Sequence, residues 1–320
     1  LYGVERRIYP SRAVDHQGRD VLDRVLRRDR RYPGGFQRDL NGRAETHALT
    51  LTFPSRDREG AVLYLHGWVD WADGSTFVAA SQGRDALRGP SLQIRGEDGR
   101  WVTAIEDMGM PAGKPKTIAV ELAGITAREF RIVTNMCVYW DEIFLGESAQ
   151  DPEARLTHLV PATADLRFRG FSAVTVHPQR RQPEYFDYAQ VRPTAMWNPT
   201  PGYYTRYGDT RALLESIDDR FVIMGSGDEL RLLFSAGGLP ALPAGWTRDF
   251  LIFVDGWAKD ADANTATGAT VDPLPFHAMR GYPDAGAEHP QPGQQGLHTR
   301  PALRLIRPLN GAGPRPAPGG

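Results

Sequence analysis

The sequence predicts a mainly β fold, in which a β-sandwich is followed by a second β-rich block and little helix forms. Three observations lead to this class. Short apolar or alternating segments recur along the first half of the chain, turn-forming residues stand between them, and the 34 Gly and 25 Pro favour turns over long helices. Several short strands at this spacing are typical of two packed antiparallel sheets.

Residues 48–147 are expected to form the sandwich, because strand-like segments follow one another there. Gly, Pro or Asp residues bound these segments, as they commonly bound strands. The segments are His47–Phe53, Ala61–Leu65, Ser91–Ile94, Trp101–Ile105, Thr117–Leu122, Phe130–Thr134 and Val138–Leu145. Glu97–Gly99 separates two of them with a turn-forming sequence and therefore predicts a hairpin.

Residues 1–47 are expected to form an N-terminal arm with a short helix. Between Asp20 and Arg31, four apolar residues follow a spacing that would place them on one face of a helix. The 11 Arg of the arm are interspersed with 7 Asp or Glu. This mixture favours a solvated arm, or a helix packed on the next domain, over an arm that binds nucleic acid.

Residues 148–282 are expected to form the second β-rich block, which packs on the first or stands beside it. Four strands and one short helix are predicted there: Asp165–Arg169, Phe221–Met224, Glu229–Phe234, Phe250–Val254 and the helix Thr210–Ile217. Gly225–Asp228 reads as a hairpin turn. The aromatic-rich segment Gln179–Gly208 is expected to pack across a sheet face. The Pro- and Gly-rich tail, 283–320, is expected to be disordered.

The composition excludes several classes of function. A net charge of −1 lacks the basic excess that nucleic-acid-binding proteins usually carry. One cysteine, Cys137, rules out an internal disulfide and a cysteine-based zinc or iron–sulfur site. The sequence contains no secretory signal and no apolar run of membrane-spanning length, so membrane insertion is not expected.

One local pattern suggests a hydrolase. The apolar segment Ala61–Trp68 leads into His66 and Gly67, which resembles the oxyanion-side turn of an α/β-hydrolase, and Ser81 lies in a small-x-Ser-x-Gly sequence. The small-x-Ser-x-Gly sequence begins only about 13 residues after His66, too few for the helix and strand that this fold needs there. The alternative is that Gly67 makes a turn and His66 pairs locally.

A calcium loop is a second candidate. Asp260, Asp262 and Asn264 place oxygen ligands at alternate positions of a loop after a strand, which suits calcium. Thr265 and Val271 stand where an EF-hand requires Gly and Glu, so the loop would be of another kind. A solvated Asp/Asn turn is the alternative.

Aromatic residues alternate with acids in two places. Trp68, Asp70, Trp71 and Asp73 lie in one loop, and Tyr139, Trp140, Asp141 and Glu142 lie before the end of a strand. Rings stack on the apolar faces of sugars and carboxylates bind hydroxyls, so Trp68, Asp70, Trp71, Asp73, Trp140 and Asp141 are candidate ligand-binding residues. The alternatives are a core role with carboxylates paired to arginine, or a carboxylate pair for glycoside hydrolysis.

Six phrases along residues 13–282 carry a resemblance to a known family. They are Leu65–Asp70, Glu106–Gly113, Arg131–Asn135, Tyr139–Ile143, Tyr204–Asp209 and Gly245–Phe250. Together they resemble the C-terminal region of large bacterial proteins with FG-GAP/VCBS β-propeller repeats and an ASPIC/UnbV segment. These proteins are similar to cartilage acidic protein and often carry tetratricopeptide repeats. The first block also resembles a galactose-binding-like jelly roll, with Phe130–Leu145 as closing strands.

The resemblance implies a non-catalytic binding or assembly module of a larger exported protein, with carbohydrate as a candidate ligand. Adjacent β-propeller or repeat domains would be its partners, and the chain would be extracellular or periplasmic. Two alternatives remain open: a purely structural domain that packs against an adjacent propeller, and a hydrolase of esterase or glycosidase type. No cofactor other than calcium is indicated.

Overall fold

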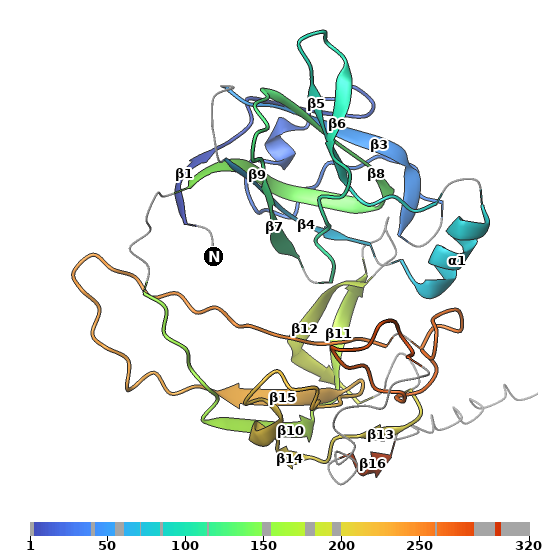
Figure 1. The fold of residues 1–320 in the computed structure, drawn as a ribbon, viewed down its shortest axis with the longest axis vertical. Helices are drawn as coiled ribbons and strands as arrows, with labels where there is room; N and C mark the ends of the chain where they lie inside the picture. Colours follow the sequence, from blue (N-terminus) through green and yellow to red (C-terminus); the bar gives the residue numbers. More distant parts are fainter. Residues whose placement is uncertain are drawn as a thin grey trace, which may run out of the picture. The chain divides into compact units, whose positions relative to one another are not determined.

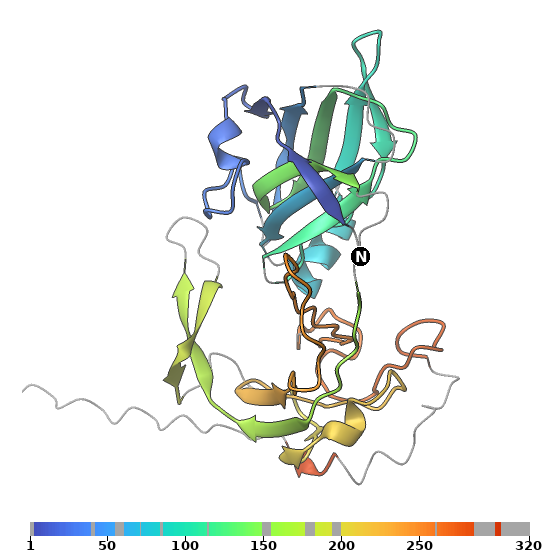
Figure 2. The same ribbon diagram turned by 90° about the vertical axis from the view of Figure 1, so that its left-hand side faces the viewer.

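The computed structural model describes most of the chain, in two compact units, 1–155 and 156–320 (Figures 1 and 2). The described residues are 3–39, 42–54, 61–70, 72–83, 86–113, 115–148, 155–176, 183–193, 200–259, 261–284 and 298–301. Antiparallel sheets dominate both units, and the described part of the chain contains one short α-helix. The mainly β class expected from the sequence is therefore confirmed.

Unit 1 contains two antiparallel sheets. The five-stranded sheet has the order β2(Arg12–Asp15), β3(Arg43–Thr52), β8(Glu129–Met136), β5(Ser91–Arg95), β6(Trp101–Ile105). The four-stranded sheet has the order β1(Val4–Ile8), β9(Val138–Ser148), β4(Val62–Val69), β7(Lys116–Glu121). All seven strands predicted for the first block are present, and the turn at Glu97–Gly99 joins β5 to β6 as expected.

One hydrophobic core takes side chains from both sheets. Leu49 and Leu51 of β3 enter it from the five-stranded sheet, and Leu63 and Leu65 of β4 enter it from the other. These residues alternate along their strands, so every second side chain points inward. Burial of each such leucine stabilises the fold by about 1.5–3 kcal/mol.

The N-terminal segment differs from the expected arm, because strands β1 and β2 belong to the two sheets. β1 pairs with β9 and β2 pairs with β3. The helix expected over Asp20–Arg31 is reduced to one 3-10 turn, η1(Leu22–Arg24). Val25 beyond this turn is fully buried in the core. Tertiary burial of the segment thus takes precedence over its helical spacing.

The α-helix α1(Gly74–Gln82) was not predicted from the sequence. Asp73 precedes it, and its side chain accepts hydrogen bonds from the Thr76 backbone N–H at 2.7 Å and from the Thr76 hydroxyl at 2.8 Å. This is N-capping, which supplies an acceptor for a backbone donor that lacks a partner within the helix. Asp73 is therefore a helix-capping residue in this structure.

The described part of unit 2 has three small sheets. They consist of β14(Gly208–Asp209), β10(Thr163–Phe168) and β15(Asp228–Leu233); of β11(Phe171–Val176) and β12(Pro183–Arg192); and of β13(Tyr203–Tyr204) and β16(Arg300–Pro301). The predictions at Asp165–Arg169 and Glu229–Phe234 are confirmed by β10 and β15. A turn is present at Gly225–Asp228, since the Asp228 N–H donates to the Gly225 carbonyl at 3.1 Å, but it is not the expected hairpin turn, because no strand precedes it.

Other predictions for unit 2 were wrong. Phe221–Met224 and Phe250–Val254 are not strands, and the helix expected at Thr210–Ile217 is one 3-10 turn, η2(Arg211–Leu213). Within the aromatic-rich segment, Phe186 and Tyr188 of β12 are exposed rather than packed across a sheet. In the tail, β16 is ordered by its pairing with β13; residues 285–297 and 302–320 lie outside the described part.

Candidate functional site

Trp68, the first of the expected ligand-binding residues, lies in a buried aromatic cluster. It is directly opposite Tyr139 on the neighbouring strand, and the two rings stack with centroids 4.9 Å apart. Tyr32 meets both rings edge-on. Trp68 and Tyr139 are buried together with Cys137 and Ala44, so the Trp68 ring contacts protein groups rather than a solvent-filled pocket.

Asp70 is buried beside this cluster, with 1% of its surface exposed. Its Oδ2 accepts a hydrogen bond from the Tyr139 hydroxyl at 3.2 Å and an ion-paired hydrogen bond from Arg38 at 3.0 Å. A carboxylate that is buried this deeply needs such partners to remain charged. Burial, with a further contribution from Asp70, raises the pKa of the Cys137 thiol to about 12, so this cysteine is not a thiolate nucleophile at neutral pH.

Trp140 and Asp141, which are adjacent on strand β9, have different surroundings. Trp140 belongs to the main hydrophobic core of unit 1. Asp141 is buried, and its Oδ1 accepts the backbone N–H groups of Asp29 and Arg30 at 3.1 and 3.0 Å. Burial raises the pKa of Asp141, whereas these two N–H groups act in the opposite direction. Asp141 thereby fixes the segment after η1 on the four-stranded sheet.

Glu142, which sequence reasoning did not single out as a site residue, has three polar side-chain partners. Its two oxygens accept from the Tyr9 hydroxyl at 2.8 Å, from Arg7 at 3.4 Å and from Arg28 at 2.9 Å. Burial, followed by the hydrogen bond to Glu142, raises the pKa of Tyr9. The Glu142 carboxylate thus connects three residues of the N-terminal segment to β9. In the second aromatic–acid sequence, this acid is paired with arginine.

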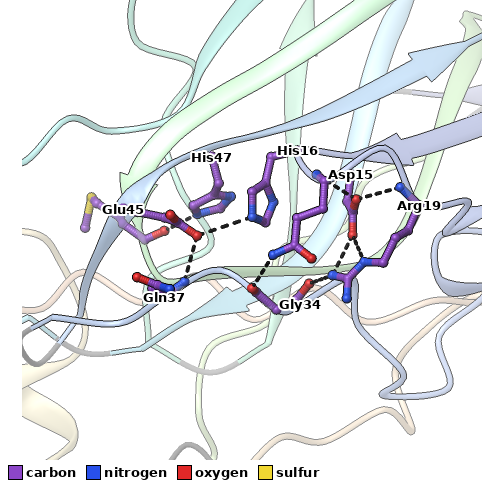
Figure 3. Close-up of polar contacts among 10 residues, drawn as sticks. Asp15, His16, Arg19, Gly34, Gln37, Glu45 and His47 are labelled. Carbon is purple, nitrogen blue, oxygen red and sulfur yellow. Dashed lines mark hydrogen bonds and ion pairs between the residues drawn. The ribbon is translucent and has the colours of Figure 1, made fainter.

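A histidine cluster lies at the edge of β3, next to these aromatic residues (Figure 3). His16 Nε2 is 3.3 Å from Glu45, and the Phe36 ring stacks on the His47 ring with centroids 4.2 Å apart. His47 Nε2 donates to the Met136 carbonyl at 2.9 Å, since a carbonyl can only accept. Burial lowers the pKa of His47, and the neighbouring His16 adds to that effect.

Asp15 holds a loop beside this cluster (Figure 3). Its Oδ1 accepts the backbone N–H groups of Gln17 and Arg19, both at 2.9 Å, and its Oδ2 pairs with the Arg19 guanidinium. Arg19 also donates to the Gly34 carbonyl at 2.7 Å. These contacts connect the turn after β2 to residues 34–37. The cluster as a whole fixes the N-terminal segment on the sheets.

The expected calcium loop is only partly described, because Asp260 lies outside the described residues, as does Trp71 of the aromatic–acid loop. Asp262 accepts the Asn264 N–H at 2.7 Å, as in a turn. The one cation in the described part of this loop is the Lys259 ammonium. It donates to the carbonyls of four residues at 2.7–3.4 Å: Thr267, Thr270, Val271 and Pro273.

Metal-site geometry is not found among the described residues, where no group of three His, Cys, Asp or Glu side chains could hold an ion. The hydrolase candidates lie in unrelated settings. The Ser81 hydroxyl donates to the Val78 carbonyl within α1, and His66 contacts the Thr117 hydroxyl at 3.1 Å. Gly67 is not in a turn but in β4, where a Cβ would lie 2.4 Å from the Tyr139 carbonyl oxygen.

The outer face of the five-stranded sheet carries an ordered polar group that the sequence analysis missed. Arg131, Gln93 and Thr103 lie side by side on three neighbouring strands. Gln93 Oε1 accepts from Nε and Nη2 of Arg131 at 2.8 and 2.5 Å, and the guanidinium lies over the Trp101 ring, 4.5 Å from its centroid. We call Gln93, Trp101, Thr103 and Arg131 the Arg131 face. The sequence does contain a signal for this face: side chains alternate along a strand, so Gln93 must point away from the core that its neighbour Leu92 enters.

A scan against protein-family models finds no match, and a search of curated proteins finds none either. Within the described residues, no helix has the length and apolar character of a membrane span.

Proposed function

We propose that this chain is a non-catalytic assembly module of a larger exported bacterial protein. Unit 1 would be a rigid, jelly-roll-type domain of the galactose-binding-like class, and unit 2 would contact a neighbouring domain. The observation that carries the proposal is a continuous apolar segment on unit 2, Phe250–Val254, whose five residues are each 66–79% exposed.

Strand connectivity supports the jelly-roll assignment. From β3 to β9 the chain passes repeatedly between the two sheets: β3, the β5–β6 pair and β8 lie in the five-stranded sheet, and β4, β7 and β9 lie in the other. Every neighbouring pair in these sheets is antiparallel. Crossing of this kind is expected when two sheets of a Greek-key sandwich wind around one core.

Exposure of Phe250–Val254 supports assembly. Five consecutive apolar residues resemble a strand that is buried on both faces, yet the described structure gives them no β pairing. Apolar patches of this kind on a soluble protein mark interaction sites. Trp257, three residues further on, is also exposed.

A β-rich neighbour suits this segment, because an extended apolar segment can pair with a sheet edge and bury both faces at once. The resemblance to proteins with FG-GAP/VCBS repeats supports an adjacent β-propeller as that neighbour and a location in the periplasm or outside the cell. The purely structural alternative differs only in lacking a ligand of its own. An esterase or glycosidase would need a catalytic set, and Ser81 and His66 have no shared partner among their described contacts.

Sedimentation velocity of the full chain over a range of concentrations tests assembly. In the absence of its neighbour, the exposed segment is expected to cause reversible self-association. Replacing Ile252 and Phe253 with Asp should abolish that association and leave the thermal midpoint unchanged, because neither side chain packs in the fold. Val102→Asp is the matched control, since Val102 is an exposed apolar residue of unit 1. A wild-type chain that stays monomeric at all concentrations would contradict the proposal.

Saccharide binding is a second candidate, and the Arg131 face favours it. This face offers a partly exposed indole beside an amide and a hydroxyl, and these are the groups that bind the apolar and polar parts of a sugar. The residues first expected to bind carbohydrate, Trp68, Asp70, Trp140 and Asp141, are engaged within the fold. A saccharide site would thus lie on the sheet rather than in the loops.

A further inference from the structure

We infer that the Arg131 face is a binding site for a carboxylate-bearing saccharide, such as a uronic acid residue of a polysaccharide. The inference rests on the saccharide-binding candidate above and is independent of assembly through Phe250–Val254. It names both the site and the charge of the ligand.

The face is organised by strand register. One row of cross-strand neighbours runs across the whole sheet: Val14, Thr50, Arg131, Gln93 and Thr103. Inward-facing neighbours such as Leu92 and Ile132 are buried in the core, so this row lies on the opposite face. A sheet holds such side chains at fixed positions without the entropy cost of ordering a loop.

Arg131 is held in place before any ligand binds. Two of its N–H groups converge on Gln93 Oε1, and its plane lies over the Trp101 indole. Gln93 is in turn 3.5 Å from the Thr103 hydroxyl through its Nε2. The guanidinium therefore loses little conformational freedom when it binds a further group.

Arg131 has no carboxylate partner among the described residues, in contrast to its neighbours. Glu129, two residues earlier on the same strand, pairs with Arg95 at 2.9 Å. The acceptor that holds Arg131 is a neutral amide, and burial lowers the pKa of Arg131 with no acidic group opposing it. A partly buried cation that lacks a counter-charge favours the binding of an anion beside it. The Nη1 nitrogen is not used in the hydrogen bonds to Gln93.

The surroundings of this cation suit a singly charged, planar acid on a sugar. A guanidinium matches the two oxygens of a carboxylate geometrically. Gln93 and Thr103 can bind neighbouring hydroxyls, and Trp101 offers apolar surface to the C–H groups of a pyranose ring. Nucleic acid is less suitable, since a phosphate backbone is bound through many cations and the chain carries a net charge of −1.

Isothermal titration calorimetry of the full chain tests this inference with two probes of equal length, a galacturonic acid trisaccharide and a neutral galactose trisaccharide. The acidic sugar is expected to bind, and the neutral one to bind at least about tenfold more weakly, as loss of a charge-assisted hydrogen bond predicts. Raising the salt concentration should weaken binding of the acidic sugar alone.

Three variants locate the site. Arg131→Met and Trp101→Ala should each reduce affinity for the acidic sugar about tenfold or more. Arg131→Lys keeps the charge but loses the planar fork, so it should bind at an intermediate strength. Arg100→Gln removes one charge from the turn of the same hairpin and should change affinity less than about twofold, because its side chain is highly exposed. Thermal midpoints of all variants establish that they are folded.

Each outcome is decisive. Equal binding of both sugars would overturn the ligand class, and binding that survives both Arg131→Met and Trp101→Ala would overturn the site. Binding of neither sugar by the folded wild-type chain would overturn the inference as a whole. None of these results bears on self-association through Phe250–Val254, which sedimentation measures separately.

Discussion

Phe36 stacks on His47, with ring centroids 4.2 Å apart and planes inclined by 14°. Phe36 also contacts Tyr139, which stacks on Trp68, so four rings form a continuous row from β3 across β9 to β4. Phe36 belongs to the N-terminal segment, and Trp68 and Tyr139 form a cluster separate from the main core. Aromatic residues that resemble a sugar-binding set in the sequence thus fix this segment to unit 1.

His47 is expected to make unit 1 less stable in acid. Burial lowers its pKa below the ordinary value of 6.5, so the unfolded chain binds more protons than the folded chain as the pH falls through that value. The stability that depends on neutral His47 is fully present above pH 6.5 and is lost as the pH falls toward the pKa of His47 in the folded chain. Each unit of lowering corresponds to about 1.4 kcal/mol of unfolding free energy.

Urea unfolding between pH 8 and pH 5 checks this prediction in wild type and His47→Gln. Glutamine can still donate to the Met136 carbonyl, so the variant should fold and lose part of the pH dependence. His16 and Glu45, which face His47, remain in both proteins. An identical pH dependence in the two proteins would show that His47 does not cause it. An NMR titration of the His47 ring measures the direction of its pKa shift directly.

Trp68→Ala is expected to destabilise unit 1 by about 3–5 kcal/mol, the usual cost of removing a buried indole. The replaced ring stacks on Tyr139 and is 7% exposed. Trp101→Ala is the matched control, because that indole lies on the sheet surface, and its cost should stay below about 1 kcal/mol. Guanidinium unfolding measures both. A Trp68→Ala chain of wild-type stability would mean that the ring is free for a ligand after all.

The Lys259 ammonium group is expected to stabilise the loop whose carbonyls it contacts, residues 267–273. Lys259→Met removes four carbonyl contacts but keeps the length of the side chain, and should lower unit 2 stability by about 1–2 kcal/mol. Lys116→Met, on β7, is the control. Trp257 fluorescence reports locally, since its ring contacts Tyr282 near the Lys259 ammonium.

Calcium binding by this loop is tested in the same samples. With the ammonium already on the carbonyls, the thermal midpoint should be the same in millimolar calcium and in chelator. A higher midpoint in calcium would instead support a site that uses Asp262 and Asn264 together with Asp260.

Local pattern predicted the strands of unit 1 well, because alternation and turn residues agree there with tertiary burial. Prediction from local pattern failed where contacts between residues distant in sequence determine the structure. Strand β1 consists mainly of charged residues and exists because β9 offers an edge, while Val25 enters the core at the expense of the helix that its spacing predicts. Helix α1 was missed although Asp73 is a recognisable cap. Phe250–Val254 has the composition of a strand without a partner strand in the described chain.

Site prediction met a different obstacle. Aromatic and acidic residues have the same composition whether they bind a sugar or hold a segment in place, and only the positions of Arg38 and the Asp29 N–H show which role Asp70 and Asp141 have. Conversely, the partners of Arg131 lie on strands β5 and β6, and Gln93 is 38 residues away from it in the sequence. Cross-strand register, which no single segment reveals, brings them together.

Hydrogen exchange of residues 250–254 in the full chain tests the assembly proposal most directly. At low protein concentration, the amides of this segment should exchange as fast as those of an unstructured peptide, and they should become protected at concentrations where the chain self-associates. Protection that is equally strong at every concentration would contradict the proposal, because it would show that the segment is already paired within its own chain.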